Sequence, residues 1–417
     1  MRRFDAIIRN RSYNNKRHFL IVRDRADKMV VVLPRFPRVL PDLILLAVAL
    51  GCQAMAAWWL LGRVTGRVAR RGIAAAAGLS FALMIFGFLL RFDRVLLFFP
   101  GVWIVWERGL AILWILLSLA WLAGFAVLRL GRRILRAGHH PARRHFLSAV
   151  RAVLFAAPPA VLAYGTFVER TRFRLREQKL EIPGLSADLE GLRLVQLTDI
   201  HLSPFLRLGD LERAVAMANE TRADVALVTG DLITTLRDPM DDCLRALAAL
   251  RARAGVYGCL GNHEVYAGGE EHAERVGAGF GIRFLRHAAA PLCFGNATLN
   301  LAGVDYQRTG RPYLRGAEEL IAPGAMNLLL SHNPDVFPVA ARQGYALTIS
   351  GHTHGGQVRV EILGEDLNVA RFYTPYVDGV YRQGAASLFV SRGLGTIGVP
   401  TRLGAPPEVA LVRLCRA

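Results

Sequence analysis

Histidines, aspartates and one asparagine recur in short polar clusters through the second half of this chain of 417 residues. The clusters hold five of its eleven histidines. In chain order they are Asp199-Ile-His201, Gly230-Asp231, Gly261-Asn262-His263-Glu264, His332 and Gly351-His352-Thr353-His354. Imidazole nitrogens combined with carboxylate oxygens are ligands that first-row transition metals bind. The clusters therefore predict a metal centre, provided that folding brings them together.

Each cluster directly follows a short apolar or β-branched run, which is typical of a buried strand. These runs are 194–197, 225–228, 256–260, 326–330 and 345–349. Helical spacing occurs at 211–221 and 241–252. The alternation predicts an α/β fold whose strand ends carry the clusters to one rim. We also expect two strands around a turn at Pro183-Gly184 and a last strand at 409–414.

The series D-x-H, G-D, G-N-H-E, H and G-H-T-H, in this order, resembles the calcineurin-like metallophosphoesterase superfamily. The resemblance covers residues 180–417. The segment 388–404 and the strand at 409–414 resemble the membrane-associated or exported branch. The resemblance implies an α/β sandwich of two mixed β-sheets flanked by helices, with two divalent metal ions at the strand ends.

The resemblance also implies a role for each site residue. The expected metal ligands are Asp199, His201, Asp231, Asn262, His332, His352 and His354. Asp231 would bridge the ions, because a carboxylate has two oxygens and a charge that offsets the repulsion between cations. The D-x-H pair and the last histidine of G-H-T-H would complete one site. The asparagine, His332 and the first histidine of G-H-T-H would complete the other.

Catalysis is expected to depend on Asp231 and His263. Two ions, expected to be Mn, Fe or Zn, can clamp the attacking and leaving oxygens of a phosphoryl transfer. His263 would not bind metal and would act at the substrate phosphate, where imidazole suits proton transfer near neutral pH. Glu264 is expected to orient His263 or a loop.

Four other polar residues carry alternative expectations. Asp305 would either line the pocket or form a turn. Arg308, Arg311 and Arg392 would either hold a substrate phosphate or lie at the surface, and the surface role is favoured in a chain so rich in arginine.

The net charge of +19 is divided unevenly along the chain. Residues 181–417 hold 22 Arg, no Lys and 25 Asp or Glu, whereas residues 1–180 hold 30 Lys or Arg and 8 acids. The half with the polar clusters is thus close to neutral, which argues against a nucleic-acid partner. The basic half is also the apolar half, which indicates flanks of a membrane region.

The first half is expected to be a basic tail, 1–38, followed by an all-α transmembrane region, 39–170. Spans are expected near 43–61, 73–90, 110–128 and 152–168. The first three have about the 20 residues that a bilayer-crossing helix needs. The first is apolar apart from Gln53, and the fourth is short and broken by Pro158-Pro159. A cleavable signal peptide is not expected, because the first apolar segment begins late and three more follow.

Residues 171–417 would then be a metallophosphoesterase domain attached to a bacterial inner or plasma membrane. The loops after the first and third spans are richest in arginine, which favours those loops in the cytoplasm and the domain on the outer side. The basic tail and the run Arg170, Arg172, Arg174 and Arg176 argue for the opposite orientation.

The combined expectation is a membrane-anchored two-metal phosphoesterase that hydrolyses a phosphate monoester, diester or pyrophosphate. A lipid-linked or envelope precursor is one candidate substrate. One alternative is a catalytically degenerate binding or scaffold protein with the same fold. Another, for a domain facing the cytosol, is an enzyme similar to UDP-2,3-diacylglucosamine pyrophosphatases. A transporter is disfavoured because the spans carry few ionisable residues.

Overall fold

The computed structural model describes residues 20–23, 29–32, 39–89, 101–134, 141–308, 312–362 and 365–417. Most of the predicted basic tail, the last residue of the second predicted span and Arg311 lie outside them. The chain divides into two compact units, residues 1–48 and 49–417. In the first unit, β1 (Leu20–Arg23) pairs antiparallel with β2 (Met29–Val32).

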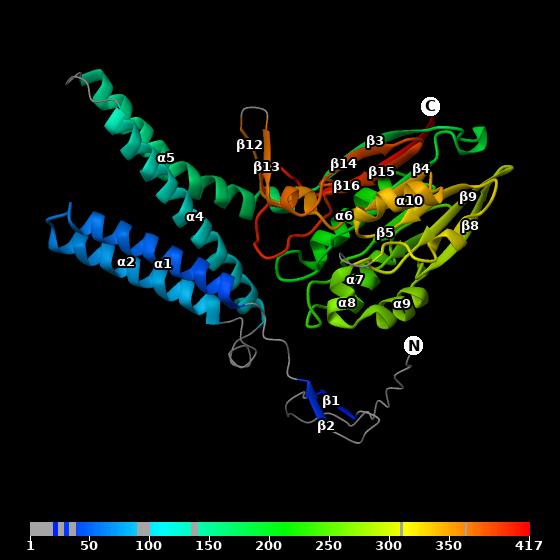
Figure 1. Ribbon diagram of the computed structural model, residues 1–417, viewed down its shortest axis with the longest axis horizontal. Helices are drawn as coiled ribbons and strands as arrows, with labels where there is room; N and C mark the ends of the chain where they lie inside the picture. Colours follow the sequence, from blue (N-terminus) through cyan, green and yellow to red (C-terminus); the bar gives the residue numbers. More distant parts are fainter. Residues whose placement is uncertain are drawn as a thin grey trace. The chain divides into compact units, whose positions relative to one another are not determined.

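Among the described residues, four helices occupy the predicted transmembrane region (Figure 1). They are α1 (Val39–Leu61), α2 (Arg67–Leu89), α4 (Gly101–Ile134) and α5 (Pro141–Phe167). In the part of the chain that the structure describes, three segments are long and apolar enough to cross a bilayer, namely Arg67–Phe88, Val105–Gly131 and Ala152–Thr171. The described part of α1 contains a shorter apolar stretch, Leu46–Leu61.

The helix α5 differs from its sequence expectation. It continues through Pro158 and Pro159, where a break was predicted. Proline lacks an N–H group and crowds the preceding turn. Apolar helices of this length tolerate it because neighbouring groups and small local adjustments satisfy the freed carbonyls.

Gln53, the polar exception in the first predicted span, joins three helices. Its amide nitrogen donates to Ser118 Oγ of α4 at 3.0 Å. Its Oε1 accepts from Ser80 Oγ of α2 at 2.5 Å, and Ser80 in turn accepts from the Trp114 indole of α4. Hydrogen bonds between apolar helices contribute about 1 kcal/mol each. Gln53 therefore sets the register of α1 against α2 and α4.

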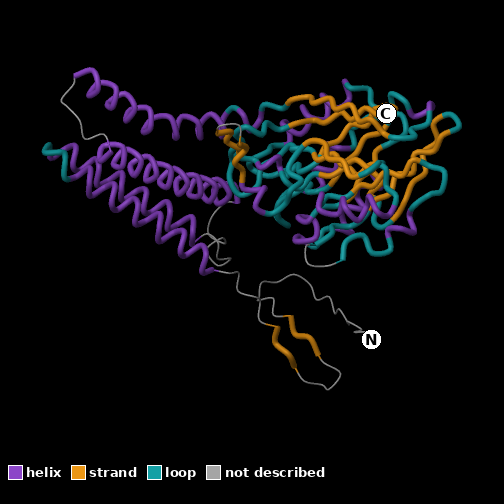
Figure 2. Tube along the Cα trace, turned by 45° about the horizontal axis from the view of Figure 1, so that its top comes forward, coloured by secondary structure: helices purple, strands orange, loops and turns teal. Residues whose placement is uncertain are grey.

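Residues 174–416 contain two six-stranded mixed sheets (Figure 2). The first has the order β3 (Arg174–Ile182), β16 (Glu408–Arg416), β4 (Arg193–Leu197), β5 (Val225–Thr229), β6 (Val256–Cys259) and β7 (Ile282–Phe284). The second has the order β14 (Gly379–Gln383), β15 (Ala386–Val390), β11 (Leu347–Ser350), β10 (Met326–Leu330), β9 (Ala297–Gly303) and β8 (Ala288–Phe294).

Alternating side chains on each strand build a four-layer sandwich. On β5, Val225 and Leu227 pack between the two sheets, whereas Ala226 and Val228 pack toward the helices of the first sheet. These helices are α6 (Leu208–Glu220), α7 (Met240–Leu247), α8 (Asn262–Ala267) and α9 (Glu270–Gly279). The helix α10 (Phe337–Gln343) covers the other face of the second sheet. Because β5 is buried on both faces, its first four residues are all apolar.

The predicted strand pair around Pro183-Gly184 has a different topology from a hairpin. Both strands exist as β3 and β4, but the C-terminal strand β16 lies between them. It pairs parallel with β3 and antiparallel with β4. The closing strand therefore completes the first sheet and ties the end of the chain to the start of the domain.

Candidate metal centre

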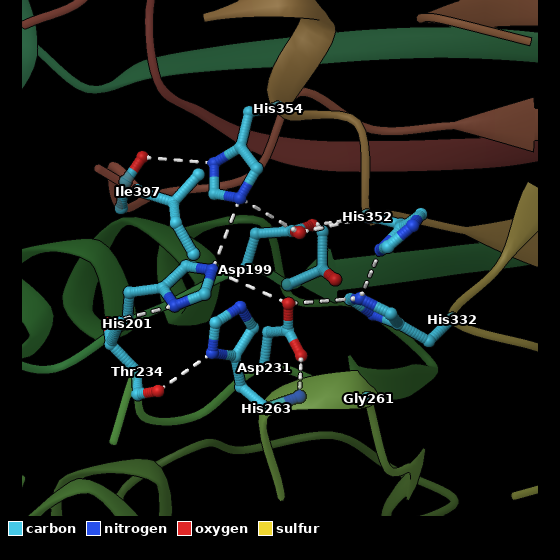
Figure 3. A network of polar contacts seen from close by, with 12 residues as sticks. Asp199, His201, Asp231, Thr234, Gly261, His263, His332, His352, His354 and Ile397 are labelled. Atoms are coloured by element: carbon cyan, nitrogen blue, oxygen red, sulfur yellow. Dashed lines mark hydrogen bonds and ion pairs between the residues drawn. The ribbon is translucent and has the colours of Figure 1, made fainter. Parts of the chain in front are cut away.

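The predicted aspartate and histidine ligands converge where parallel strands of both sheets end (Figure 3). Asp199 and His201 follow β4, Asp231 follows β5, Asn262 follows β6, His332 follows β10, and His352 and His354 follow β11. The strands β4, β5 and β6 are parallel, as are β10 and β11. Their carboxyl ends therefore bring distant segments of the chain to one rim.

Two groups of side chains lie close enough to hold metal ions, and both include Asp231. The first group is Asp199, His201, Asp231 and His354, and the second is Asp231, His332 and His352. Ligand atoms within each group lie within 4.8 Å of one another. One carboxylate thus belongs to both groups, as a bridging ligand must.

The distances centre on one oxygen of Asp231. Asp231 Oδ2 lies 3.5 Å from His201 Nε2 and 3.1 Å from His332 Nε2. His354 Nε2 lies 3.1 Å from His201 Nε2 and 3.4 Å from an Asp199 oxygen. On the other side, His352 Nδ1 lies 3.2 Å from His332 Nε2.

Backbone carbonyls determine which imidazole nitrogens face the centre. His332 Nδ1 donates to Thr229 O at 2.8 Å, and His354 Nδ1 donates to Gly395 O at 3.4 Å. In both residues Nδ1 is therefore taken up by a carbonyl and Nε2 points inward, where it carries a lone pair whenever the ring is neutral. A nitrogen lone pair that points inward repels another lone pair or a carboxylate that it faces, unless a proton or a cation lies between the two. Carbonyls that orient ligand imidazoles in this way are usual around metal ions.

Asn262 supplies an independent test of fit. Its side chain is buried at the start of α8, and its Oδ1 atom has no hydrogen-bond partner among the described residues. An unsatisfied buried oxygen costs roughly 1–3 kcal/mol. A cation would satisfy it, so the residues present fit a divalent metal pair.

Burial gives most of these imidazoles low pKa values. It lowers the pKa of His201 to about 3 and that of His352 to about 4. His332 is the exception, because the adjacent Asp231 carboxylate outweighs burial and raises its pKa to about 10. Although burial opposes ionisation of Asp231, His332 and His201 hold its pKa well below the usual range. Metal binds to neutral imidazole, so His201 and His352 are already in the binding form at neutral pH, whereas His332 must release a proton when a metal binds.

Five of the predicted ligands have left-handed backbone conformations. Their φ angles lie between 48° and 78°, at Asp199, His201, Asp231, His352 and His354. Such angles are uncommon outside glycine, although Asp and His tolerate them better than most residues. Residues in strained conformations cluster at functional sites, where the surroundings hold them in place.

Glycines allow the close approach of these loops. A Cβ atom on Gly351 would overlap the Asp199 carboxylate, and one on Gly261 would overlap the Asp231 carboxylate. The glycines of G-N-H-E and G-H-T-H are therefore required by the tight packing of backbone against ligand side chains.

Glu264 connects two of the site loops. Its buried carboxylate accepts hydrogen bonds from the backbone N–H groups of Asp231 at 2.9 Å, Leu232 at 2.7 Å and Gly261 at 2.7 Å. Of the two expected roles, orienting His263 or orienting a loop, the contacts correspond to the second. Glu264 holds the G-D loop against the G-N-H-E loop.

His263 lies beside both groups without belonging to either. Its backbone N–H donates to Asp231 Oδ1 at 2.9 Å, and its ring lies 4.8 Å from that of His201. Its Nδ1 atom donates to Thr234 O at 2.7 Å, which leaves Nε2 available for a substrate. This geometry suits the expected non-ligand role.

Two residues near the centre were not singled out from the sequence. The Tyr306 ring lies 5.7 Å from the ring of His352, and burial raises the pKa of its phenol, which stays a hydrogen-bond donor. Arg402 is fully buried behind His354. Neither has a local sequence signal, because tyrosine and arginine are common and only the fold brings these two to the site.

Arg402 satisfies several loop carbonyls at once. Its guanidinium donates to Gly395 O, to Ala405 O at 3.0 Å and to Arg392 O at 2.9 Å. Burial lowers its pKa to about 10, so it remains charged at neutral pH. Since Gly395 O also accepts from His354 Nδ1, Arg402 supports the orientation of a predicted ligand.

We expect Arg402→Met to destabilise the domain by about 3 kcal/mol, because it leaves several buried carbonyls unpaired. For a domain of this size the melting temperature should fall by roughly 6–12 °C. Thermal unfolding of the full chain in detergent measures this. The matched control is Arg413→Met, which removes an exposed arginine from β16. Equal melting temperatures for the two variants would contradict the assigned role.

Two of the remaining polar candidates, Asp305 and Arg392, form ion pairs within the domain. Asp305 forms a two-pronged ion pair with Arg286 at 2.8 and 3.0 Å. Arg392 donates to Asp378 at 2.8 Å, and Arg308 is exposed. Arg392 therefore stabilises the domain in this structure.

Comparisons with known proteins show relatives of this part of the chain. A family model described as calcineurin-like phosphoesterase matches residues 192–356. An uncharacterized metallophosphoesterase of Aquifex aeolicus is 30% identical over 250 residues, which cover 58% of this chain and 91% of that protein. Phosphodiesterase YaeI of Escherichia coli is 29% identical, with 65% of this chain and 98% of that protein covered. A transmembrane protein with metallophosphoesterase domain of Danio rerio is 29% identical, and the matched region spans 65% of this chain and 64% of that protein.

Proposed function

Because this chain belongs to the calcineurin-like phosphoesterase family, we propose that it is a membrane-anchored phosphoesterase with two divalent metal ions. The observation that carries the proposal is that Asp231 belongs to both groups of candidate ligands. Its Oδ2 atom lies between His201 Nε2 and His332 Nε2, which belong to different groups. A single carboxylate between two sets of inward imidazoles is the arrangement that a bridged metal pair requires.

Seven side chains would hold the metals, with Asp231 as the bridge. They are Asp199, His201, Asp231 and His354 at one ion and Asp231, Asn262, His332 and His352 at the other. The bound pair would supply Lewis-acid stabilisation of the oxygens that attack and leave phosphorus. Mn, Fe and Zn all suit this mixture of nitrogen and oxygen ligands.

His263 would transfer the proton that the reaction needs. Its Nδ1 atom is held by Thr234 O, so Nε2 can carry a proton toward the oxygen that leaves phosphorus. Hydrolysis breaks the bond from phosphorus to that oxygen and forms one to an oxygen of water. The attacking water releases one proton to solvent, and His263 gives one to the leaving oxygen. The substrate would be a phosphate monoester, diester or pyrophosphate.

Metal removal tests the proposed function. We expect the full chain in detergent to hydrolyse bis(p-nitrophenyl) phosphate, to lose nearly all activity after treatment with a chelator, and to regain it with Mn²⁺. Release of p-nitrophenol and metal content per chain are the measurements. A chelated, metal-free chain that keeps its full rate would refute a metal-dependent mechanism.

The three long apolar segments support the anchor. We propose that they span a bacterial inner membrane and that the domain faces outward, since the arginine-rich loops follow the first and third predicted spans. A reporter fused after residue 417 tests this orientation. We expect an outward-active reporter to give signal, and strong signal from a cytosol-only reporter would reverse the assignment.

A further inference from the structure

A two-stranded hairpin near the candidate metal centre carries a set of exposed apolar side chains. Figure 1 shows β12 (Arg359–Ile362) and β13 (Glu365–Asn368) outside both six-stranded sheets, followed by the short helix η6 (Val369–Phe372). We refer to residues 359–362 and 365–373 together as the apolar hairpin. Its exposed apolar side chains and their exposed fractions are Val360 48%, Leu367 55%, Val369 64%, Phe372 88% and Tyr373 82%.

These side chains are grouped by the register of the hairpin. Val360 lies directly opposite Leu367 in the antiparallel pair, so both project from one face. Phe372 and Tyr373 follow within five residues of Asn368. Soluble surfaces seldom expose several large apolar side chains together, and such patches mark sites that bind a protein or a membrane.

The base of the hairpin is hydrogen-bonded to a segment that contacts the last candidate span. Arg359 N donates to Leu403 O at 2.8 Å, and the neighbouring Arg402 N donates to Gly165 O at 3.1 Å. Gly165 lies in the final turns of the apolar segment Ala152–Thr171. Two hydrogen bonds and one peptide unit therefore connect the hairpin to the end of that span.

The first turns of α4 contact the same region of the domain. The Trp106 ring lies 5.3 Å from Phe205, and Gly109 faces Pro400 so closely that a Cβ atom would lie 2.5 Å from the proline ring. Trp106 and Gly109 begin the apolar segment Val105–Gly131. The adjoining ends of two candidate spans thus contact the loop that also supports the hairpin.

The hairpin is also continuous with the candidate metal centre. It begins five residues after His354, and Gly356 packs so closely against the buried Asn368 that a Cβ atom would lie 2.7 Å from it. Arg402 donates to Gly395 O, the carbonyl that also accepts from His354. The same few residues therefore join the metal centre, the hairpin and the end of a span.

We propose that the apolar hairpin lies in the headgroup region of the bilayer, and that the centre acts on amphiphiles whose phosphate is presented at that surface. This inference rests on the proposed membrane anchor and phosphoesterase activity. Tyrosine, phenylalanine and aliphatic side chains are the types that enter the boundary between headgroups and acyl chains. The chain's own spans hold the hairpin close to this boundary, which identifies the bilayer as the partner that covers it.

The kinetic test compares two phosphodiesters with the same leaving group. One is water-soluble bis(p-nitrophenyl) phosphate, and the other is a p-nitrophenyl phosphodiester of diacylglycerol in phospholipid vesicles that contain the full chain. Because the spans stay intact, a Phe372→Ser, Tyr373→Ser variant remains anchored. We expect its kcat/KM for the lipid ester to fall about tenfold or more and its rate on the soluble ester to stay unchanged.

The matched control keeps apolar side chains at the same positions. A Phe372→Leu, Tyr373→Trp variant should retain wild-type rates on both esters. The inference fails if the serine variant hydrolyses the lipid ester at the wild-type rate, or loses both activities equally. If the wild type hydrolyses neither ester, the proposed function fails instead. The position of the apolar hairpin at the bilayer is then tested by a second measurement.

That second measurement places an environment-sensitive dye on the hairpin. Phe372→Cys is labelled in a chain whose more accessible thiols, Cys293 and Cys415, are changed to serine, and Arg413→Cys serves as the exposed reference. In vesicles whose lipids carry a quencher, we expect quenching at position 372 and little at position 413. Equal quenching at both positions would overturn the inference, as would shielding of position 372 in detergent that increases with protein concentration, which would indicate a second copy of the chain.

Discussion

Asp231→Asn is expected to lower phosphodiester hydrolysis by at least about 10³-fold without unfolding the chain. The substitution removes the one carboxylate shared by both groups. Loss of a metal ion forfeits several kcal/mol of stabilisation of the reacting oxygens, and each 1.36 kcal/mol corresponds to a factor of ten. We expect fewer than one metal ion per chain where the wild type holds about two.

The fold should survive because the local hydrogen bonds do. The amide oxygen of asparagine can still accept from His263 N, as Asp231 Oδ1 does at 2.9 Å. Its amide nitrogen can donate toward His332 Nε2, which the carboxylate oxygen now faces at 3.1 Å. The raised pKa of His332 depends on the Asp231 charge, so the ring should become neutral in the variant.

Three measurements separate chemistry from folding in this variant. They are p-nitrophenol release, metal content per chain and thermal unfolding, with Asp241→Asn as the control. Asp241 is an exposed aspartate of α7, paired with His272. A variant at Asp231 that matched the control in both rate and metal content would refute the bridging role.

His263→Gln is expected to lower kcat by about 10²–10⁴-fold with the metal content unchanged. The ring belongs to neither group of candidate ligands, yet it lies beside both. Glutamine can keep a hydrogen bond to Thr234 O, which now accepts from His263 Nδ1 at 2.7 Å. It cannot transfer a proton near neutral pH, so the loss should fall on kcat.

The choice of leaving group sharpens the test of His263. An ester whose leaving oxygen is strongly basic needs protonation, whereas p-nitrophenolate leaves more readily without it. The defect should therefore be larger for an alkyl phosphodiester than for bis(p-nitrophenyl) phosphate. His272→Gln, which changes an exposed histidine on α9, is the control. Loss of metal from His263→Gln would make this residue a ligand and overturn the assignment.

Several elements of the domain were predictable because their patterns are local. The run at 326–330 is β10 (Met326–Leu330), and the expected strand at 409–414 lies within β16 (Glu408–Arg416). Both consist mainly of apolar residues between polar neighbours, a pattern that depends on the adjacent sequence. The helices α6 and α7 overlap their predicted ranges, although α7 ends at Leu247, five residues before the expected end.

Long-range features were not predictable in the same way. Nothing in β3, β4 or β16 indicates locally that the last strand lies between the first two. The apolar hairpin was not predicted because its strands have four residues each, and Val360 and Leu367 on them are exposed rather than buried. Arg402 was not predicted because the sequence does not distinguish a buried arginine from the many exposed ones.

The sequence by itself determined the types of side chain at the strand ends, since short apolar runs specify strands and the clusters follow them directly. The order of these clusters also identified the family. Only the tertiary structure decided that one oxygen of Asp231 faces imidazoles from both groups, and that Arg402 and Thr229 help to hold those imidazoles. These contacts join residues that are remote in the chain, and their distances depend on how two sheets pack, which local periodicity does not encode.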